Sequence, residues 1–211
     1  MSIVSLKNIN KRFEDKVLFE NFSLDVEAGD YLSITGASGS GKTTLLNMIG
    51  LIEKPDSGDA ILFDIKNADF GSRQACELRR KKMAYLFQNY GLVDNETCEF
   101  NLNMSLEFSD LKKSDKTRLI ADTLKKVGLS DYEKRKIFSL SGGEQQRVAL
   151  AKLIVKDPEL ILADEPTGSL DADNRDFVLS ILDELNKNGK TIIIVTHDPK
   201  VDSCAKRHLS L

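Results

Sequence analysis

The sequence predicts an α/β fold in which a mostly parallel sheet is covered by helices on both faces. Short apolar runs, typical of strands buried on both faces, recur at residues 31–35, 83–87, 160–163 and 191–195. Segments with helical periodicity alternate with these runs, as at residues 42–49 and 175–186. From about residue 89 to residue 151 the chain is polar with apolar positions at helical spacing, which indicates a helical lobe inserted into the core.

The N-terminal segments add smaller elements to this core. Residues 3–7 and 22–27 alternate between apolar and polar side chains, which predicts two short strands joined through a turn near Glu14 and Asp15. Three further elements are a turn, a strand and a helix, predicted at residues 55–58, 60–63 and 74–82.

The length of 211 residues suits a single core with a small appended lobe. We expect one domain over residues 1–211, made of a catalytic core at 1–88 and 152–211 and the helical lobe at 89–151. The 30 basic and 33 acidic residues give a formal net charge of -3. This balance argues against nucleic acid as the main partner, because proteins that bind it usually carry a basic excess. We interpret the basic run at 79–82 as a solvated helix end.

Cysteine usage and hydropathy indicate the compartment. Cys76, Cys98 and Cys204 are scattered without a CxxC pair, which fits a reducing compartment without a disulfide framework. The sequence has no run of about 18 apolar residues, and its first residues lack the basic and apolar regions of a signal peptide. We therefore expect a cytoplasmic protein that reaches a membrane only through a partner.

A glycine-rich segment joins the run at 31–35 to the predicted helix at 42–49, with the sequence Gly36-Ala37-Ser38-Gly39-Ser40-Gly41-Lys42-Thr43. The form GxxxxGK[ST] between a strand and a helix predicts a loop that binds phosphates. Its glycines let backbone N–H groups converge on the phosphates, and the helix N-terminus adds favourable partial charge. We expect Lys42 to reach the β- and γ-phosphates, Thr43 to bind Mg²⁺, and Thr44 to lie in the same site.

Two adjacent carboxylates, Asp164 and Glu165, follow the apolar run at 160–163. Open α/β sheets bind ligands at the carboxyl ends of their strands. We therefore expect Asp164 to hold Mg²⁺ and Glu165 to orient or deprotonate an attacking water. Capping of a following helix is the structural alternative for this pair.

Gln88 and His197 each follow another of the predicted strands, at 83–87 and 191–195, so both should lie at the same edge of the sheet. The neutral amide of Gln88 can contact Mg²⁺ and the water without adding charge. The imidazole of His197 can hold the γ-phosphate in place. Taken alone, each is as compatible with a surface or structural role.

A second candidate phosphate site begins at Ser141. The residues Ser141-Gly142-Gly143-Glu144 open a segment whose apolar positions have helical spacing. A serine at a helix start is normally only an N-cap, but the doubled glycine leaves backbone N–H groups exposed for an anion. One nucleotide needs one phosphate loop, so a second such site predicts a second copy of the chain and an ATP-dependent dimer.

In their order along the chain, these motifs resemble those of ABC-type ATPases. The segments 36–43 and 160–165 resemble Walker A and Walker B, and Leu140–Gln145 resembles the signature motif that defines the family. Three further positions stand where the Q-loop, the D-loop and the switch histidine stand: Gln88, Ser169–Asp171 and His197. Phe13 stands where the family usually has a tyrosine as the adenine platform. Phenylalanine keeps the stacking face and loses the hydroxyl.

The resemblance implies a P-loop NTPase fold of the ABC type, with an antiparallel β subdomain beside the parallel core. It implies binding of ATP and Mg²⁺, ATP hydrolysis, and head-to-tail pairing in which the segment 141–144 of one copy contacts the γ-phosphate held by the other. It also implies a separate transmembrane permease that docks near Gln88, attachment to the inner face of the cell membrane through that permease, and an adaptor protein as a further candidate partner.

The cargo is not specified by these motifs. Residues 163–171 and 195–198 are similar to the lipoprotein-release and macrolide-export branch of the family, and residues 87–97 are similar to bacteriocin exporters of the lactococcin 972 group. Export of a peptide, a drug or a lipoprotein-like substrate therefore remains open.

Two other functions of the same fold are alternatives. A DNA-repair or chromosome-maintenance ATPase would carry a long coiled coil between Lys42 and Ser141, and that stretch has no sustained heptads. A regulatory module that binds ATP without hydrolysing it would lack catalytic side chains, whereas Glu165, Gln88 and His197 are all present. The sequence therefore favours a transport ATPase.

Overall fold

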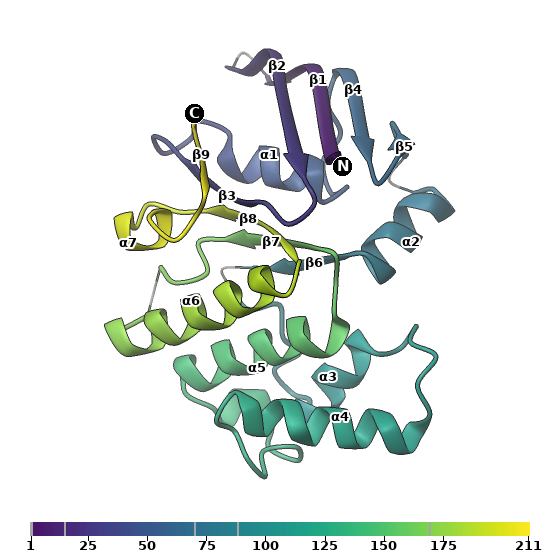
Figure 1. The fold of residues 1–211 in the computed structure, drawn as a ribbon, viewed down its shortest axis with the longest axis vertical. Helices are drawn as coiled ribbons and strands as arrows, with labels where there is room; N and C mark the ends of the chain where they lie inside the picture. Colours follow the sequence, from purple (N-terminus) through teal and green to yellow (C-terminus); the bar gives the residue numbers. More distant parts are fainter. Residues whose placement is uncertain (1, 15, 70, 88, 169) are drawn as a thin grey trace.

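Two sheets form the core of the computed structural model, which describes residues 2–14, 16–69, 71–87, 89–168 and 170–211. An antiparallel sheet has the strand order β2-β1-β4-β5, and a parallel sheet has the order β6-β7-β8-β3-β9 (Figure 1). The strands are β1 (Ser2–Phe13), β2 (Lys16–Glu27), β3 (Tyr31–Thr35), β4 (Ser57–Leu62), β5 (Ile65–Lys66), β6 (Met83–Leu86), β7 (Leu160–Asp164), β8 (Thr191–Val195) and β9 (Arg207–Ser210). The helices are α1 (Lys42–Ile49), α2 (Arg73–Lys81), α3 (Cys98–Ser105), α4 (Lys113–Lys126), α5 (Gly142–Lys156), α6 (Ala172–Lys187) and α7 (Pro199–Asp202), with a 3-10 turn at Ile137–Ser139. The predicted α/β fold with a parallel core and an antiparallel subdomain is confirmed.

The antiparallel sheet is built on the hairpin of β1 and β2, and both strands are longer than the sequence pattern predicts. Val4, Leu6 and Ile9 are buried along β1. The register of the pair shifts between Leu6 and Ile9, where Asn8 has a φ of 50°. This irregularity interrupts the alternation of apolar and polar residues, which is why the pattern alone indicates a strand only over residues 3–7.

The parallel sheet aligns the carboxyl ends of its central strands. Asp164 at the end of β7 is in register with Val195 at the end of β8, and Ile34 of β3 is also in register with Val195. All five residues of β8 are buried, as its apolar sequence predicts. Strand β9 was not predicted. It lies at the edge beside β3 and is mostly exposed, so it has no apolar run to reveal it.

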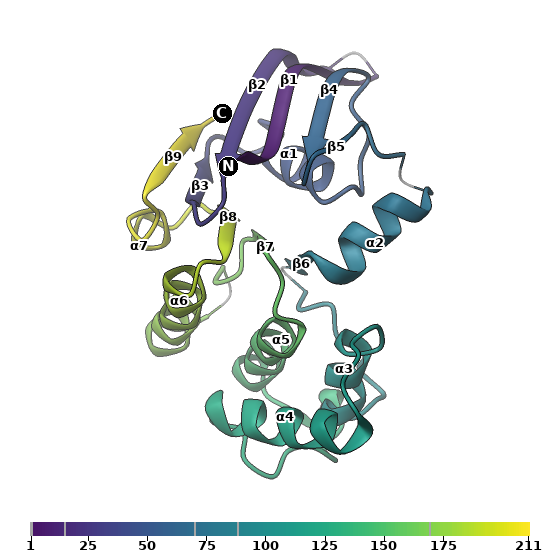
Figure 2. The same ribbon diagram turned by 45° about the vertical axis from the view of Figure 1, so that its right-hand side comes forward.

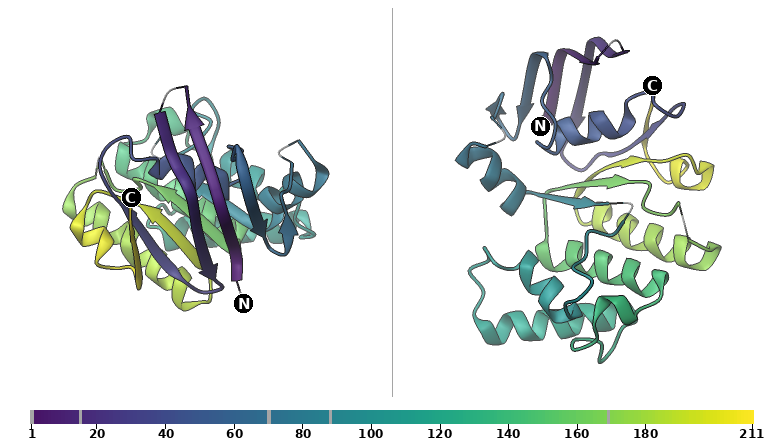
Figure 3. Two further views of the ribbon diagram at one scale, coloured as in Figure 1. Left: turned by 90° about the horizontal axis from the view of Figure 1, so that it is seen from above. Right: turned by 180° about the vertical axis from the view of Figure 1, so that it is seen from behind.

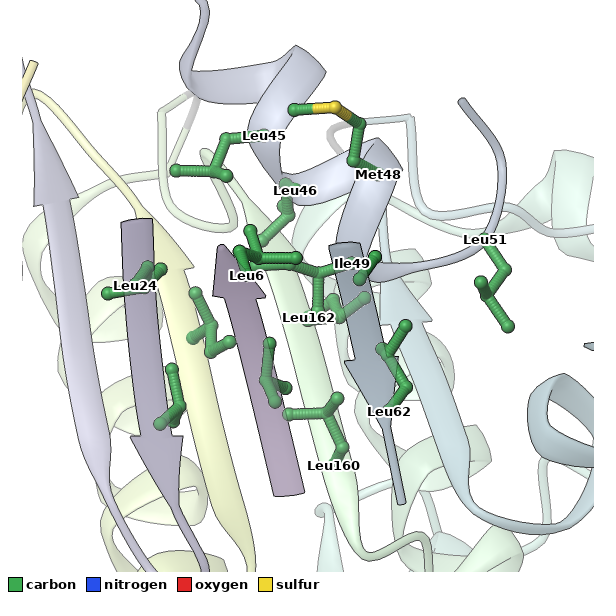
Figure 4. Close-up of a cluster of buried hydrophobic side chains, with 14 of the residues drawn as sticks. Leu6, Leu24, Leu45, Leu46, Met48, Ile49, Leu51, Leu62, Leu160 and Leu162 are labelled. Carbon is green, nitrogen blue, oxygen red and sulfur yellow. The ribbon is translucent and has the colours of Figure 1, made fainter. Parts of the chain in front are cut away.

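Helix α1 lies between the two sheets, which fixes the position of its N-terminus (Figure 2). Leu46 and Ile49 of α1 are fully buried in one cluster with Leu6 and Leu62 of the antiparallel sheet and Leu162 of β7 (Figure 4). The helix therefore packs against both sheets, and the loop before it is held at the edge of the parallel sheet.

Helices α5 and α6 cover the opposite face of the parallel sheet, and α3 and α4 lie at the far end of the molecule from the antiparallel sheet (Figure 3). Helix α5 takes part in two clusters. Leu150 and Leu153 pack with the sheet, whereas Val148 and Val155 pack with α3 and α4. The expected boundary at residue 151 thus falls inside a helix that belongs to both parts. None of the described helices has both the length and the apolar character needed to span a bilayer.

Candidate active site

The glycine-rich loop runs from the end of β3 to the start of α1, as the sequence predicts. Gly36, Gly39 and Gly41 have positive φ values of 145°, 74° and 101°. A Cβ at Gly41 would lie 2.9 Å from the ring of Phe19, so that position has no room for a side chain. Helix α1 has no side-chain cap and no acidic residue in its first turn, which leaves its N-terminal N–H groups available to an anion.

Lys42 is buried at the base of this loop. Its Nζ donates hydrogen bonds to the carbonyl oxygens of Gly36 and Ala37, both at 2.9 Å. The hydroxyl of Ser40 is buried and has no hydrogen-bond partner among the described residues. A cation, free N–H groups and an unpartnered hydroxyl gathered in one glycine-rich loop are the donor set that phosphate oxygens require.

Two carboxylates face the loop from the end of β7. Burial raises the pKa of Asp164, whereas a hydrogen bond from the side chain of Thr43 and the charge of Lys42 oppose this rise. Burial also raises the pKa of Glu165, and the charge and backbone N–H of His197 oppose part of that rise. Asp164 and the hydroxyl of Thr43 are oxygen ligands of the kind that Mg²⁺ takes from a protein when phosphates supply the rest.

Glu165 is held by the neighbouring strand. Its N–H donates to the carbonyl of Val195 at 3.0 Å, and its own φ is 45°. Its Oε1 lies 3.4 Å from Nε2 of His197, is buried, and has no hydrogen-bond partner within the described part of the chain. An unpartnered carboxylate oxygen beside an imidazole suits a group that accepts a proton.

These predicted residues meet in one cavity of about 280 Å³. It is lined by Leu18, Ser38, Gly39, Gly41, Lys42, Thr43, Thr44, Asp164, Glu165, Val195 and His197. Residues from the ends of three parallel strands therefore come together beside the glycine-rich loop, as the position of each motif after a strand predicts.

Other predicted residues lie outside this cavity. Phe13, at the end of β1, is 46% exposed, with Nζ of Lys11 4.8 Å from its ring centroid. Phe13 pairs with Lys16 of β2, and Nζ of Lys16 donates to the carbonyl of Gly39 at 2.7 Å, so this pair lies beside the glycine-rich loop. Gln88 and, within the predicted D-loop, Ser169 lie outside the described residues.

Ser141 is the N-cap of α5, and Glu144 closes a capping box with it. Oε2 of Glu144 accepts from the N–H and the hydroxyl of Ser141, at 2.8 and 2.9 Å, and Oε1 accepts from the hydroxyl of Tyr132 at 2.7 Å. A Cβ at Gly143 would lie 3.0 Å from the side-chain amide of Asn174, so the helix start is closely packed on that side.

This helix start faces a separate cavity of about 460 Å³. Its lining is Gly128, Leu129, Tyr132, Ser141, Gly143, Glu144, Arg147, Asp171 and Asn174, none of which lines the first cavity. The structure thus does not bring the two candidate phosphate sites of one chain together.

Three residues at these sites were missed by the sequence reasoning. Lys16 contacts the glycine-rich loop from a strand without a motif, and Tyr132 reaches Glu144 from a turn. Asn174 accepts from Arg147 at 3.1 Å and donates to Asp171 at 2.8 Å. Only Asn174 had a local signal, since it lies three positions after the N-cap Asp171, where capping contacts are expected.

Comparison with known proteins supports an ATP-binding cassette. The sequence profile of the ABC transporter family matches residues 19–168. The chain is 38% identical to the uncharacterized ABC transporter ATP-binding protein YvrO of Bacillus subtilis, over 97% of this chain and 91% of that protein. It is 37% identical to the macrolide export ATP-binding/permease protein MacB of Campylobacter jejuni over 99% of its own length, and spans 33% of that relative.

The fold is also similar to a solved structure. The ATP-binding cassette MJ0796, in a dimeric post-hydrolysis state bound to ADP and Pi, superposes with a TM-score of 0.89 at 34% sequence identity. The match covers 99% of this chain and 94% of that one. The similarity therefore extends over the whole described fold, including the glycine-rich loop and the helical part.

Proposed function

The chain belongs to the ABC transporter family, and from this premise we propose that it is the ATP-hydrolysing subunit of an exporter. Two copies pair head to tail, so that each of two ATP molecules lies between the glycine-rich loop of one copy and the start of α5 of the other. The observation that carries this proposal is that the two segments expected to bind phosphate open on separate cavities of a single chain. A post-hydrolysis dimer of the related cassette MJ0796 supports it.

The first half of each site holds the triphosphate. The N–H groups at the start of α1 and the ammonium of Lys42 bind its oxygens, and Phe13 provides the stacking face for the adenine. Thr43 and Asp164 would hold Mg²⁺, with Gln88 as a further ligand. The metal ion supplies charge stabilisation on the phosphate oxygens as the terminal phosphoryl group leaves.

Glu165 is the general base of the proposed reaction. Its unpartnered Oε1 accepts the proton of the attacking water, and the raised pKa makes it a better base than a solvated carboxylate. His197 lies 3.4 Å from that oxygen, where it can orient the water and contact the γ-phosphate. Loss of a general base of this kind typically slows turnover by about 10²–10⁴-fold.

The second half of each site comes from the other copy. The hydroxyl of Ser141 and a backbone N–H of the adjacent glycines, Gly142 or Gly143, donate to the γ-phosphate, which makes two contacts at each site. Hydrogen bonds to charged groups contribute roughly 1.5–3 kcal/mol each, so two such contacts at each of two sites give on the order of 6–12 kcal/mol if additive. Moving a two-state equilibrium from 1:99 to 99:1 takes ~5.5 kcal/mol. Hydrolysis can therefore open the dimer and move an attached membrane protein.

The attached protein is a transmembrane permease, which also places the chain at the inner face of the membrane. The MacB relatives are named ATP-binding/permease proteins, which supports the association of an ATP-binding part with a permease. A cytoplasmic segment of the permease docks in a groove between the parallel sheet and α3, near Tyr85 and Phe87. The exported cargo is a drug, a peptide or a lipoprotein-like molecule, and an adaptor protein is a further partner of the complex.

The test is the ATP-dependent mass of a variant that hydrolyses ATP only slowly. Glu165→Gln, saturated with ATP and Mg²⁺, should double its mass by light scattering, and turnover should fall by about 10²–10⁴-fold. Ser141→Arg in the same background is the control, which should bind ATP and stay monomeric. A Glu165→Gln protein that stays monomeric with bound ATP, or one with near-normal turnover, contradicts the proposal.

A further inference from the structure

Helix α5 carries a buried glutamine on the face that packs on the parallel sheet. Gln146 is only 1% exposed. Ala149, Leu150 and Leu153, which lie three, four and seven positions further along the helix, belong to the cluster that covers the sheet. A helix presents residues at this spacing on one face. Gln146 is therefore a polar side chain at a position where packing alone would favour an apolar one.

The side-chain amide of Gln146 has a partner for its nitrogen and none for its oxygen. Nε2 donates to the carbonyl of Pro166 at 2.8 Å. Oε1 is buried and has no hydrogen-bond partner among the residues that the structure describes. A buried polar atom without a partner lowers stability, and a methionine of similar size would avoid that loss. The hydrogen bond to Pro166 is therefore what the amide supplies at this position.

Pro166 belongs to the turn at residues 165–168, which carries the proposed general base. Glu165 has a φ of 45°, in the left-handed region that side chains other than glycine rarely adopt. The N–H of Gly168 donates to the carbonyl of Glu165 at 3.3 Å and closes the turn. A backbone in this region persists only where the surrounding structure holds it in place.

The turn is held on both sides of Glu165. On the side of the strand, the N–H of Glu165 donates to the carbonyl of Val195 at 3.0 Å. On the other side, proline offers no N–H, and the amide of Gln146 holds the proline carbonyl. A Cβ at Gly168 would lie 3.8 Å from Cβ of Glu165 and 4.0 Å from its Oε2, so the turn packs against the carboxylate side chain. A displaced turn would therefore displace the carboxylate.

We propose that Gln146 is a positioning residue for hydrolysis, which holds the carboxylate of Glu165 in its working orientation by fixing the carbonyl of Pro166. This inference rests on the proposed function, which makes Glu165 the base. Gln146 does not line the cavity of the site and acts only through the turn. Helix α5 begins next to Ser141, about 7.5 Å along the helix axis from Gln146. The helix that contacts the nucleotide of the other copy thus also holds the base of its own site.

The experiment compares the full chain with Gln146→Met, which keeps the length of the side chain and removes both polar atoms. Displacing a catalytic group by about 1 Å lowers the rate by on the order of 10²-fold, so kcat should fall by about 10–100-fold. KM and the Kd of a fluorescent ATP analogue should change by less than about twofold, because the contacts of the triphosphate remain. The urea midpoint should stay close to that of wild type, because the carbonyl of Pro166 loses its partner while the unpartnered Oε1 is removed.

Two further variants separate positioning from a general effect on the fold. Gln146→Glu restores a donor when its carboxyl group is protonated, which burial favours, so its kcat at about pH 6 should exceed that of Gln146→Met. In the Glu165→Gln background, Gln146→Met should slow single-turnover hydrolysis by no more than about twofold, since groups that act as a unit have non-additive effects. Equal rates of the two Gln146 variants at that pH, or fully additive losses, contradict the inference.

Asn186→Leu is the matched control. Asn186 is also a buried amide on a helix, and its Nδ2 donates to the carbonyls of Gly29 and Lys190, both at 2.9 Å. These carbonyls precede β3 and β8, so they lie at the edge of the sheet opposite the site. The control should lower the urea midpoint and keep kcat. A control that loses kcat as strongly as Gln146→Met would assign both losses to stability and overturn the inference.

The outcomes for this inference and for the proposed function are distinct. If kcat of Gln146→Met stays within about twofold of wild type, or if ATP affinity and stability fall together with it, the inference is overturned and the proposed function stands. Near-normal turnover of Glu165→Gln, or absence of its ATP-driven dimer, would instead overturn the proposed function, whatever Gln146→Met does.

Discussion

Glu144 places a negative charge beside the serine that is proposed to receive a phosphate. Its two carboxylate oxygens accept three hydrogen bonds, two from Ser141 and one from Tyr132. The hydrogen bonds from Tyr132 and Ser141 lower the pKa of Glu144, so the group is an anion at neutral pH. Replacing it in Glu144→Gln removes the charge and keeps an oxygen acceptor for the N–H of Ser141. We predict that this variant forms the ATP-bound dimer more readily than the parent.

The size of the effect follows from the geometry. Oε2 of Glu144 lies 2.9 Å from Oγ of Ser141. A phosphate oxygen accepting from that hydroxyl would lie about 2.6 Å beyond it, so carboxylate and phosphate oxygens would be at most about 5.5 Å apart. Coulomb repulsion at this distance is about 0.8–3 kcal/mol per phosphate charge for effective dielectric constants of about 80 to 20. Because Glu144 is half-exposed, we take the lower end. Two sites then give about 1.5 kcal/mol, or about a tenfold lower dimer dissociation constant.

The assay is a concentration series in light scattering or sedimentation, with ATP and Mg²⁺, in the Glu165→Gln background. Tyr132→Phe is the control, because it removes one hydrogen bond to Glu144 and leaves the carboxylate in place, so its dimer should be nearly unchanged. High salt should shrink the difference between Glu144→Gln and the parent. A dimer of unchanged or weaker affinity in Glu144→Gln would refute the reasoning. It would mean that the capping hydrogen bonds between Glu144 and Ser141 affect the dimer and that the charge of the carboxylate does not.

Three further predictions concern stability and use thermal or urea unfolding of the nucleotide-free chain. Burial raises the pKa of Asp164, so the folded state binds its proton more tightly than the unfolded state, and stability falls as pH rises through and above the ordinary carboxyl range. Asp164→Asn should therefore unfold at a higher temperature than wild type at pH 7, with the difference shrinking at low pH; a lower melting temperature at pH 7 contradicts this. Asn101 is fully buried; its side chain accepts from the N–H of Val93 and donates to the carbonyls of Val93 and Thr97. Asn101→Ala should therefore lower the free energy of unfolding by about 1–3 kcal/mol. A change within the error of urea unfolding would contradict this prediction. Ile49→Ala opens a cavity between the two sheets and should lower the free energy of unfolding by about 2–5 kcal/mol. A decrease of less than about 1 kcal/mol would contradict this prediction.

The central strands of the parallel sheet could be predicted because they are shielded from water. Strands β7 and β8 are buried on both faces, so their sequences are continuous apolar runs that need no context. Strand β9 and the full length of β1 could not be predicted, for opposite reasons. The first is an exposed edge strand held by backbone pairing with β3, and the second is interrupted at Asn8, where the register shifts.

The same distinction applies to the candidate site. Asp164, Glu165 and His197 follow recognisable strands, and parallel strands bring their ends together, so their meeting in one cavity could be predicted. The contacts of Lys16 with Gly39 and of Tyr132 with Glu144 depend on how distant segments approach each other. The local sequence does not indicate these contacts, because neither Lys16 nor Tyr132 belongs to a motif in its own segment.

On each side of the proposed site, one donor that would bind phosphate already has an acceptor within the same chain. Lys42 donates to carbonyl oxygens of its own loop, and the hydroxyl of Ser141 donates to Glu144. A nucleotide must therefore replace existing hydrogen bonds on both sides, and the net gain is smaller than the gross energy of its contacts. A diphosphate can replace those of Lys42 alone, whereas only a γ-phosphate also reaches Ser141 of the other copy. These existing hydrogen bonds make dimer formation depend on the triphosphate. Removing the charge of Glu144 should therefore reduce that dependence.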